Sequence, residues 1–525
     1  MGSGENIKNH ISRRKFGRYL GLTTGAVLLS GCVNNNTRVK QTFEFVERKN
    51  TTPLDLSQIP EPVFEEDESL VALYWKAWEY AWDHVVTQKD MPQSPYMDEA
   101  FWPDTIWIWD TCFMAFFCKY APGLFPGIES LDNFYEIMYN DNPANIYIQH
   151  PDNPPLFAWA EWEYYKMTGD KARLINIVKE KKYLQKHYDF FENRAEGKAY
   201  PWCGEGCYPQ IKKLAHGYLW EADISGMDNT PRGYRNFSNM LWLDALAQQG
   251  LSAKYIAKIA KEIGDYETYQ KYMRYFNLKS EILNRYYWNE SDGFYYDISI
   301  GTPYDHYKIK TPASYWPLLS GMSTKRQAES LRAHASDPDV FGGDIPWPSV
   351  ARDNEFFEEK GNYWRGSVWL PTAYMAIKGL NNYGYFKEAN ESSYKLIKHM
   401  AKTYSDYSPH TIWECYNPTV AAPGTDKTNM ERVRPNFCGW SALGPISLFI
   451  ENVLGFYDID ALKSKVCWNM HRTGTHGIKN LKFGEIKTDI IFKQGAVNVK
   501  SNKSFTLEIN GVAYFIKQGE QIFRI

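Results

Sequence analysis

Three short segments far apart in this chain each place one acidic side chain among aromatic and amide groups. They are Trp-Ile-Trp-Asp at 107–110, Ser-Gly-Met-Asp-Asn-Thr-Pro-Arg at 225–232 and Trp-Glu-Cys-Tyr-Asn-Pro at 413–418. An acid flanked by rigid aromatic rings is more typical of a pocket than of a solvated surface. Aromatic faces stack on the C–H surfaces of sugars, and carboxylates and amides bind their hydroxyls. Two carboxylates facing each other across such a pocket can hydrolyse a glycosidic bond.

Asp228 is the first candidate for a catalytic group. Thr230-Pro231 suits the start of a helix, with the hydroxyl as the cap and the proline in the first turn. Asp228 is then expected on a loop just outside a helix N-terminus. Arg232 is close enough along the chain to contact either a substrate hydroxyl or Asp228 itself. The alternative is that Asp228 only organises its loop.

Glu414 is the second candidate, because Trp413, Tyr416 and Pro418 surround it. A glutamate in such surroundings loses solvation, and its pKa then responds to neighbouring charges. The alternative is a buried glutamate satisfied by backbone amides. Further aromatic, amide and charged residues recur where loops meet apolar helices, and they are candidates for the same site. These are Trp107, Trp109, Asp110, Gln149, Tyr363, Trp364, Arg365, Trp369 and Trp440.

Helices have to position these residues. From 67 to 457, apolar residues recur at three- and four-residue spacing, which predicts an almost entirely helical domain. Amphipathic stretches, expected as outer helices, alternate with stretches that are apolar on nearly all sides and are expected inside. The amphipathic stretches are 68–88, 173–196, 251–286 and 384–404, and the apolar stretches are 112–120, 237–250, 364–379 and 438–453.

Aromatic, proline-rich loops precede the apolar stretches. They lie near positions 102, 150, 228, 311, 362 and 436. We therefore predict six helical hairpins closed into a ring, an (α/α)6 barrel, with these loops clustered at one end. A linear helical solenoid is the alternative, but the irregular spacing and the absence of a repeated signature disfavour it.

The last part of the chain, 458–525, has a different character. Residues 488–492, 496–500 and 505–509 resemble strands. Asn510-Gly511 predicts a tight hairpin into a further strand over 512–516. A small C-terminal β appendage is therefore expected. Residues 41–46 could add one more strand, within a linker predicted over 41–66.

The first 40 residues are expected to be an export signal. Ser-Arg-Arg-Lys-Phe at 12–16 is a twin-arginine pattern, and the apolar stretch 20–30 is too short to span a bilayer. Leu-Ser-Gly-Cys at 29–32 resembles a bacterial lipobox, which predicts cleavage before Cys32 and its lipidation. The alternative is a chance cysteine after a signal peptide. We expect an exported bacterial lipoprotein, periplasmic or in the cell envelope, attached to the membrane only through this lipid.

Composition narrows the class of ligand. Aromatic residues make up 16% of the chain, which favours a ligand with apolar faces and polar edges. The formal net charge is −3, and acids and bases are interspersed without a basic patch. Nucleic-acid binding is therefore not expected.

The cysteines and one acidic segment were considered as possible disulfide, zinc or calcium sites. Of eight cysteines, seven follow Cys32, and an odd number argues against a full disulfide framework. Cys203 and Cys207 lie in a glycine loop and could form a small disulfide or stay free. A zinc site would need two more ligands. The acidic run 289–297 does not have the spacing of a calcium loop, and we predict a β-turn with Gly293 at the bend.

Four ordered motifs resemble those of glycoside hydrolase family 63. They are Gly-Met-Asp-Asn at 226–229, Asn-Tyr-Trp-Arg-Gly at 362–366 with Trp369, Trp-Glu-Cys-Tyr-Asn-Pro at 413–418 and Gly-Trp-Ser at 439–441. The family includes processing α-glucosidases and bacterial mannosylglycerate hydrolases, and trehalases are more distant relatives. The resemblance covers about residues 68–456. It implies an (α/α)6 barrel and inverting, exo-acting hydrolysis of a terminal α-linked sugar.

The resemblance also implies roles for individual residues. By motif position, Asp228 would be the general acid and Glu414 the general base, with no metal or organic cofactor. A sugar subsite would be lined by Asp110, Gln149, Arg232, Tyr363, Trp364, Arg365 and Trp440.

Two other classes of function stay open at this point. The first is a non-catalytic, glycan-binding lipoprotein on the same barrel. The second is a polysaccharide lyase or a glycosyl phosphorylase. A lyase would favour a Tyr/His or Arg/Lys site for uronates, and a phosphorylase would need a basic phosphate pocket, whereas the segment 413–418 fits neither. The sugar, the linkage and the oligomeric state are left open.

Overall fold

The computed structural model describes residues 50, 52–99, 104–142, 144, 146–193, 197–204, 207–233 and 239–525. All of them belong to a compact unit that spans Phe43–Ile525. The predicted twin-arginine pattern, the lipidation site Cys32 and the strand over 41–46 lie outside the described residues. Within the described part of the chain, no helix combines the length and apolarity needed to cross a bilayer.

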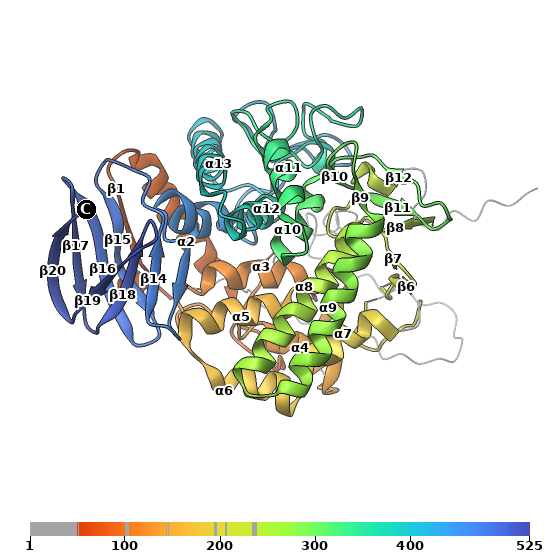
Figure 1. The fold of residues 1–525 in the computed structure, drawn as a ribbon, viewed down its shortest axis with the longest axis horizontal. Helices are drawn as coiled ribbons and strands as arrows, with labels where there is room; N and C mark the ends of the chain where they lie inside the picture. Colours follow the sequence, from red (N-terminus) through yellow and green to blue (C-terminus); the bar gives the residue numbers. More distant parts are fainter. Residues whose placement is uncertain are drawn as a thin grey trace, which may run out of the picture. The chain divides into compact units, whose positions relative to one another are not determined.

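Six helices form a closed inner ring, in which each contacts the next and the last contacts the first. Every residue of α3 and of η8 is buried, as expected for helices surrounded by others on all sides. Several ring helices are labelled near the centre of Figure 1. In order, the ring helices are α3 (Ile108–Cys118), α5 (Phe157–Thr168), α8 (Leu243–Glu262), α10 (Trp316–Ser320), α12 (Leu370–Asn382) and the π-helix η8 (Gly444–Val453).

Longer amphipathic helices pack around this ring. For example, α9 contacts α8, and α13 contacts both α12 and η8. They bury one apolar stripe each and leave a polar face outside, as their sequence pattern predicts. The outer helices are α2 (Glu68–Asp83), α4 (Leu131–Tyr139), α7 (Tyr183–Asn193), α9 (Tyr266–Tyr286), α11 (Lys325–Ser336) and α13 (Phe386–Asp406). Short turns of helix connect them: α6 (Lys171–Leu174), the π-helix η2 (Ile175–Glu180) and the 3-10 helices η1 (Leu56–Gln58), η3 (Pro231–Gly233), η5 (Pro312–Tyr315), η6 (Tyr363–Arg365) and η7 (Ser441–Leu443).

One predicted helix boundary is wrong. The stretch 251–286 was expected to be one outer helix, but its first half continues the inner helix α8 and its second half is the outer helix α9. The chain reverses at Gly264, whose φ of +81° suits glycine. Asp265 then caps α9 by accepting a hydrogen bond from the Thr268 N–H. The apolar spacing did not reveal the break between α8 and α9, because both helices bury apolar residues on the sides that face each other.

The C-terminal region forms two packed sheets, drawn in blue in Figure 1. The five-stranded sheet has the order β1-β15-β16-β17-β20, in which β1 (Glu61–Phe64) comes from the N-terminal part of the chain, and the four-stranded sheet has the order β13-β14-β18-β19. Phe483 of β15 meets Phe505 of β18 across the sheets, with ring centroids 5.7 Å apart. The strands are β13 (Asp458–Asp460), β14 (Lys465–Trp468), β15 (His476–Phe483), β16 (Ile486–Lys493), β17 (Ala496–Ser501), β18 (Phe505–Ile509), β19 (Val512–Ile516) and β20 (Gly519–Arg524).

The predicted strands over 488–492, 496–500, 505–509 and 512–516 are confirmed. So is the hairpin between the last two, where Asn510 and Gly511 have φ values of +48° and +83°, as such a turn requires. The predicted linker 41–66 needs a correction, because it contains β1 (Glu61–Phe64), which pairs antiparallel with β15. Phe64 is buried against Phe449 of η8, so this segment is held by both the sheet and the helical ring.

Short strands pair the loops that connect the helices. Residues 288–295 form a hairpin, β9 with β10, and Gly293 has a φ of +60°, which confirms the turn predicted there. Most relevant to the site is β4, which pairs in parallel with β5. The short strands are β2 (Val85–Val86), β3 (Tyr96–Met97), β4 (Thr105–Trp107), β5 (Tyr147–Gln149), β6 (Lys212–Leu214), β7 (Gly217–Leu219), β8 (Met240–Leu241), β9 (Trp288–Asn289), β10 (Phe294–Tyr295), β11 (Asp297–Ser299) and β12 (His306–Tyr307).

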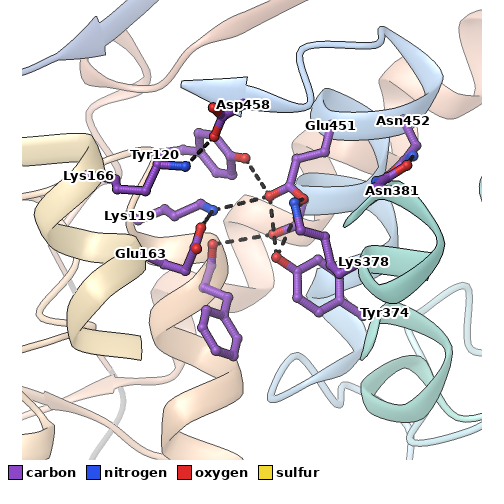
Figure 2. Close-up of polar contacts among 12 residues, drawn as sticks. Lys119, Tyr120, Glu163, Lys166, Tyr374, Lys378, Asn381, Glu451, Asn452 and Asp458 are labelled. Carbon is purple, nitrogen blue, oxygen red and sulfur yellow. Dashed lines mark hydrogen bonds and ion pairs between the residues drawn. The ribbon is translucent and has the colours of Figure 1, made fainter. Parts of the chain in front are cut away.

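The C-terminal ends of four ring helices meet in a buried network of charges, shown in Figure 2. Glu451 on η8 is its centre. Its carboxylate lies 3.2 Å from Lys119 Nζ and 2.7 Å from Lys378 Nζ, and it accepts a 2.7 Å hydrogen bond from the Tyr120 hydroxyl. Lys119 also reaches Glu163 on α5, at 3.4 Å. The network therefore fastens α3, α5, α12 and η8 to one another at this end.

The same network reaches the C-terminal sheets. Lys166 on α5 pairs with Asp458, the first residue of β13. The space left between these side chains is a cavity of about 20 Å³, which is the room that one water molecule needs. This end of the helical ring is therefore filled by ionic side chains and is too tight for a sugar.

Candidate active site

The N-terminal ends of the ring helices carry most of the predicted site residues. Trp107 directly precedes α3, and Trp109 and Asp110 lie in its first turn. Trp369 directly precedes α12, and Trp440 precedes η7, which leads into η8. The first turns of neighbouring ring helices lie side by side, so residues hundreds of positions apart in sequence are brought to the same end of the ring.

Four of the predicted tryptophans form one contiguous aromatic cluster. Trp364 stacks on Trp369 with ring centroids 4.0 Å apart. Trp109 lies 6.2 Å from Trp364 and 6.1 Å from Trp440, and Trp369 lies 5.7 Å from Trp440. Each is no more than 1% exposed. This cluster joins the segments 107–110, 362–369 and 439–441 into one wall.

The Asp228 segment is packed against the same wall. Gly226 has a φ of +83°, and a Cβ atom added there would lie 2.3 Å from the ring of Trp109. Only glycine allows this close approach and this backbone conformation. Trp107 and Gln149 are paired neighbours in the β4–β5 ladder, so strand pairing brings two further predicted residues together.

Glu414 is buried and is held by a tyrosine and an arginine. The Tyr363 hydroxyl donates a 2.8 Å hydrogen bond to Oε1. Arg434 Nη2 lies 3.1 Å from Oε1, and its Nε donates to Oε2 at 3.3 Å. Arg434 also reaches Glu99, at 3.4 Å. A neighbouring guanidinium favours the ionised form of a carboxyl group, so these contacts suit a carboxylate that stays charged.

Asp228 is also buried and contacts a lysine. Lys427 Nζ lies 3.1 Å from Asp228 Oδ2. The same ammonium lies 5.7 Å from the ring centroid of Tyr363, the residue that donates to Glu414. The two candidate carboxylates are therefore connected through only two intervening side chains, although 186 positions separate them in the sequence.

Backbone contacts fix the spacing of these two loops. Asn229 Oδ1 accepts a 2.7 Å hydrogen bond from the Trp364 N–H, and Asn229 Nδ2 donates to the Asn362 carbonyl at 3.0 Å. Arg365 Nε donates to the Asn229 carbonyl at 3.3 Å. The loop of the candidate acid is thereby locked to the loop that presents Tyr363 to the candidate base.

The loop that presents Tyr363 is strained. Asn362 and Tyr363 have φ values of +36° and +60°, a conformation that costs non-glycine residues about 1–3 kcal/mol each. The hydrogen bonds to Asn229 and Glu414 hold this backbone in place. Strain maintained by its surroundings is common where a side chain must be aimed at a reacting group.

Arg232 has a different environment from the one expected. It was predicted to contact a substrate hydroxyl or Asp228. Instead its guanidinium donates to Asp244 at 2.7 Å and 2.9 Å, and to Asp297 at 2.8 Å and 2.6 Å. Both partners are buried. Arg232 therefore ties the start of α8 to β11, because two carboxylates occupy its fixed fork of donors.

The remaining predicted residues lie around the same end of the ring. Asp110 and Trp413 are buried, and Trp440 Nε1 donates to the Glu414 carbonyl at 3.0 Å. Gln149 is near the loop of Cys203 and Cys207, whose sulfur atoms are 3.1 Å apart as free thiols. Within the described ranges, no three His, Cys, Asp or Glu side chains gather in a way that could hold a metal, and independence from metals stays a prediction.

Sequence reasoning missed Arg434 and Lys427, which contact the two carboxylates, and Glu99, which pairs with Arg434. One local signal existed. Trp107, Trp242, Tyr315, Trp369 and Trp440 each stand directly before a helix of the ring or its leading turn. That repeated aromatic position marks the site end of the ring, but it gives no indication of which charged residues fold onto it.

Comparison with known proteins places the chain among glycoside hydrolases. Residues 139–428 match the mannosylglycerate hydrolase MGH1-like glycoside hydrolase domain. A protein of Borreliella burgdorferi is 26% identical over 475 residues, which cover 85% of this chain and 94% of that protein. The mannosyl-oligosaccharide glucosidase of Saccharomyces cerevisiae is 26% identical over 351 residues, 62% of this chain. The chain spans only 38% of that relative's length.

Among solved structures, the family 63 mannosylglycerate hydrolase of Thermus thermophilus, in complex with Tris and D-glycerate, superimposes with a TM-score of 0.53. The two sequences are 16% identical, and the match covers 71% of this chain and 99% of the other. At this identity the likeness concerns the fold, which in both chains is built on a ring of paired helices.

Proposed function

Because this chain belongs to the mannosylglycerate hydrolase MGH1-like glycoside hydrolases of family 63, we propose that it is an inverting, exo-acting α-glycosidase. It removes a terminal α-linked sugar on an (α/α)6 barrel, with Asp228 as the general acid and Glu414 as the general base. The observation that carries this assignment is the linkage of the two buried carboxylates through Lys427 and Tyr363.

The environment of Glu414 suits a base. It must be ionised to accept a proton from water, and Arg434 and the Tyr363 hydroxyl both stabilise the charged form. The same contacts fix its direction, so that one orientation of the carboxylate is presented to a water molecule. Positioning of this kind is worth about 10²–10⁴-fold in rate.

The reaction follows from the two roles. Asp228 donates its proton to the glycosidic oxygen as the bond to the anomeric carbon breaks. Glu414 takes a proton from a water molecule that attacks that carbon from the opposite face. The sugar leaves with inverted configuration, and the two carboxyl groups are expected about 6.5–9.5 Å apart to leave room for the water.

The closed end of the ring supports exo action. The charged network around Glu451 lies at that end, and the cavity among its side chains has a volume of about 20 Å³. A glycan can then enter only from the end that carries Asp228 and Glu414, and a chain that cannot pass through is cleaved at its terminus. The names of the relatives make glucose and mannose the candidate sugars.

We also propose where in the cell the enzyme is located. The lipobox at 29–32 predicts attachment of the exported enzyme to a bacterial envelope through Cys32. Membrane fractionation of the wild type and of Cys32→Ala tests it. The wild type is expected with the membrane and the variant in the released fraction, and identical distributions would reject lipidation.

Stereochemistry tests the enzymatic proposal most directly. Purified protein is mixed with a panel of α-linked glucose and mannose disaccharides, and the first product is followed by proton NMR. The β-anomer is expected before mutarotation mixes the two forms. Early α-anomer would overturn the inverting assignment. Unsaturated or phosphorylated products would indicate a lyase or a phosphorylase, and glycan binding without any product would indicate a binding protein.

A further inference from the structure

The contact between Lys427 and Asp228 creates a chemical conflict at the proposed acid. A general acid must carry a proton when the substrate is bound. Lys427 Nζ lies 3.1 Å from Asp228 Oδ2, and the Lys427 side chain is only 17% exposed. An opposite charge at this distance favours the ionised form of a carboxyl group. In this arrangement, the pair disfavours the protonation state that catalysis needs.

Lys427 has a second carboxylate within reach. Its ammonium lies 3.5 Å from Asp223 Oδ1. The Asp223 side chain is 50% exposed, whereas that of Asp228 is 3% exposed. A small rotation of the lysine side chain therefore exchanges a buried partner for a solvated one, without any change of the backbone.

The loop that carries Lys427 is fixed at its base. The buried carboxylate of Asp426 accepts hydrogen bonds from the N–H groups of Thr428 and Asn429. Thr425 pairs with Arg432 across the loop. The lysine is therefore presented to Asp228 by an ordered turn, and only its side chain needs to move.

Two other charged groups of the described residues near Asp228 have partners of their own. Among the described residues, Arg365 binds the carbonyl of the adjacent Asn229. Glu414 is paired with Arg434 and lies beyond Tyr363. Lys427, in contrast, is a cation in direct contact with the candidate acid.

We propose that Lys427 is a positioning residue that keeps Asp228 ionised in the substrate-free enzyme and moves to Asp223 when substrate binds. This inference rests on the proposed function of Asp228. The glycosidic oxygen has to lie within hydrogen-bonding distance of the Asp228 carboxyl group, in the space beside Lys427. Once the ammonium has moved, Asp228 binds a proton from solvent water and later donates it to the leaving oxygen. The proton is therefore loaded only in the complex.

The pH dependence of kcat/KM tests this proposal in the full chain, because its alkaline limb reports the ionisation of the acid in the free enzyme. Lys427→Met is expected to move that limb upward by about 1–3 pH units, the usual effect of removing an opposite charge. Lys427→Arg keeps the charge and should leave the limb in place. Asp223→Asn removes the second partner and should move the limb downward. The probes are the α-linked disaccharides of glucose and mannose.

A substrate that needs no protonation provides the internal control. Fluoride leaves without a strong acid, so the alkaline limb measured with α-glucosyl or α-mannosyl fluoride should not follow these substitutions. A uniform loss of activity in Lys427→Met, with an unchanged limb on the disaccharides, would show that the lysine only supports the loop and would overturn the proposal.

A stability measurement separates this inference from the proposed function. A double-mutant cycle between Lys427→Met and Asp228→Asn, read by urea unfolding, should show a favourable coupling at pH 7. The coupling should disappear at low pH, where Asp228 is protonated in the wild type and in Lys427→Met. Absence of coupling at pH 7 would overturn the inference even if the enzyme is active. Coupling in a protein that cleaves no member of the panel would leave the charge pair standing and reject the glycosidase assignment.

Discussion

The two ends of the helical ring both bury carboxylates, but they pair them in different ways. At the C-terminal end, Glu451 is held by Lys119, Lys378 and two tyrosine hydroxyls, all from helices of the ring or residues directly following them. At the N-terminal end, Asp228 and Glu414 sit on loops, and their cations Lys427 and Arg434 come from the loop between α13 and η7, which also carries Glu414. The charges at the C-terminal end therefore connect ring helices to one another, whereas the charges at the N-terminal end connect the loops between them.

Burial and charge act in opposite directions at the C-terminal end, and charge prevails. Burial disfavours the charged form of Glu163, but the positive charges of Lys119 and Lys166 outweigh it and lower its pKa to about 2. Burial likewise opposes the charge of Glu451, while Lys119 and Lys378 lower its pKa below the usual value. These groups stay ionised at neutral pH and have no proton to donate. At the loop end, the proposal made for Lys427 instead assigns Asp228 a partner that moves when substrate binds.

The largest expected effect is a loss of catalytic activity when the carboxylates at the N-terminal end of the ring are replaced. Asp228→Asn and Glu414→Gln should each lower kcat by about 10²–10⁴-fold or more, the contribution of a positioned acid or base. Each variant should still fold and unfold cooperatively, although the loss of its buried ion pair lowers its unfolding temperature. Turnover on the cleaved disaccharide and a melting curve are the two measurements. A variant with near-normal turnover and normal unfolding would remove that residue from its catalytic role.

The second effect is a loss of folding stability when the buried charge network at the C-terminal end of the ring is broken. Glu451→Gln leaves Lys119 and Lys378 without their shared carboxylate in a buried site, which typically costs about 3–5 kcal/mol. Urea unfolding measures the loss, and kcat per folded molecule should be unchanged. Glu290→Gln serves as the matched control, because its partner Arg326 is 72% exposed and an exposed pair contributes little. Loss of kcat in folded Glu451→Gln would mean that this end takes part in catalysis.

A third and smaller effect is a dependence of stability on pH. Glu163 has a lowered pKa in the folded protein, about 2 against an ordinary value of 4.5. Its stabilising effect, on the order of 3 kcal/mol, is fully present above about pH 5 and is lost as pH falls from about 4.5 to about 2. Unfolding free energies of the wild type and Glu163→Gln should converge over that range. Parallel curves would show that the ion pairs of Glu163 do not stabilise the fold.

The smallest expected effect concerns neither end. Removal of residues 1–40 should leave the activity and unfolding temperature of the remaining chain unchanged, because no core-forming pattern lies in that stretch. Activity and melting curves of the truncated and full chains provide the test. A truncated protein that is folded but inactive on a disaccharide cleaved by the full chain would mean that this stretch contributes to the site.

Local sequence alone determined much of this protein. The alternation of amphipathic and apolar stretches predicted a ring of paired helices with the aromatic loops at one end. Asn510-Gly511 and Gly293 predicted turns that the structure contains. The segments 107–110 and 362–369 were predicted to share a site, and their tryptophans do meet. Such features follow from backbone preference and periodicity, which act over a few residues.

Only the tertiary structure decided which charges meet. Arg434 was not predicted at Glu414, and Lys427 was not predicted at Asp228, 199 positions away in sequence. Arg232 was predicted beside Asp228, and it binds Asp244 and Asp297 instead. Likewise, β1 lies in a predicted linker because its partner strand β15 begins more than 400 residues later. Ion pairs and strand pairing depend on the distance between residues in the folded protein. A local sequence pattern predicts the geometry of a few neighbouring residues, but it does not predict which distant residues come close together.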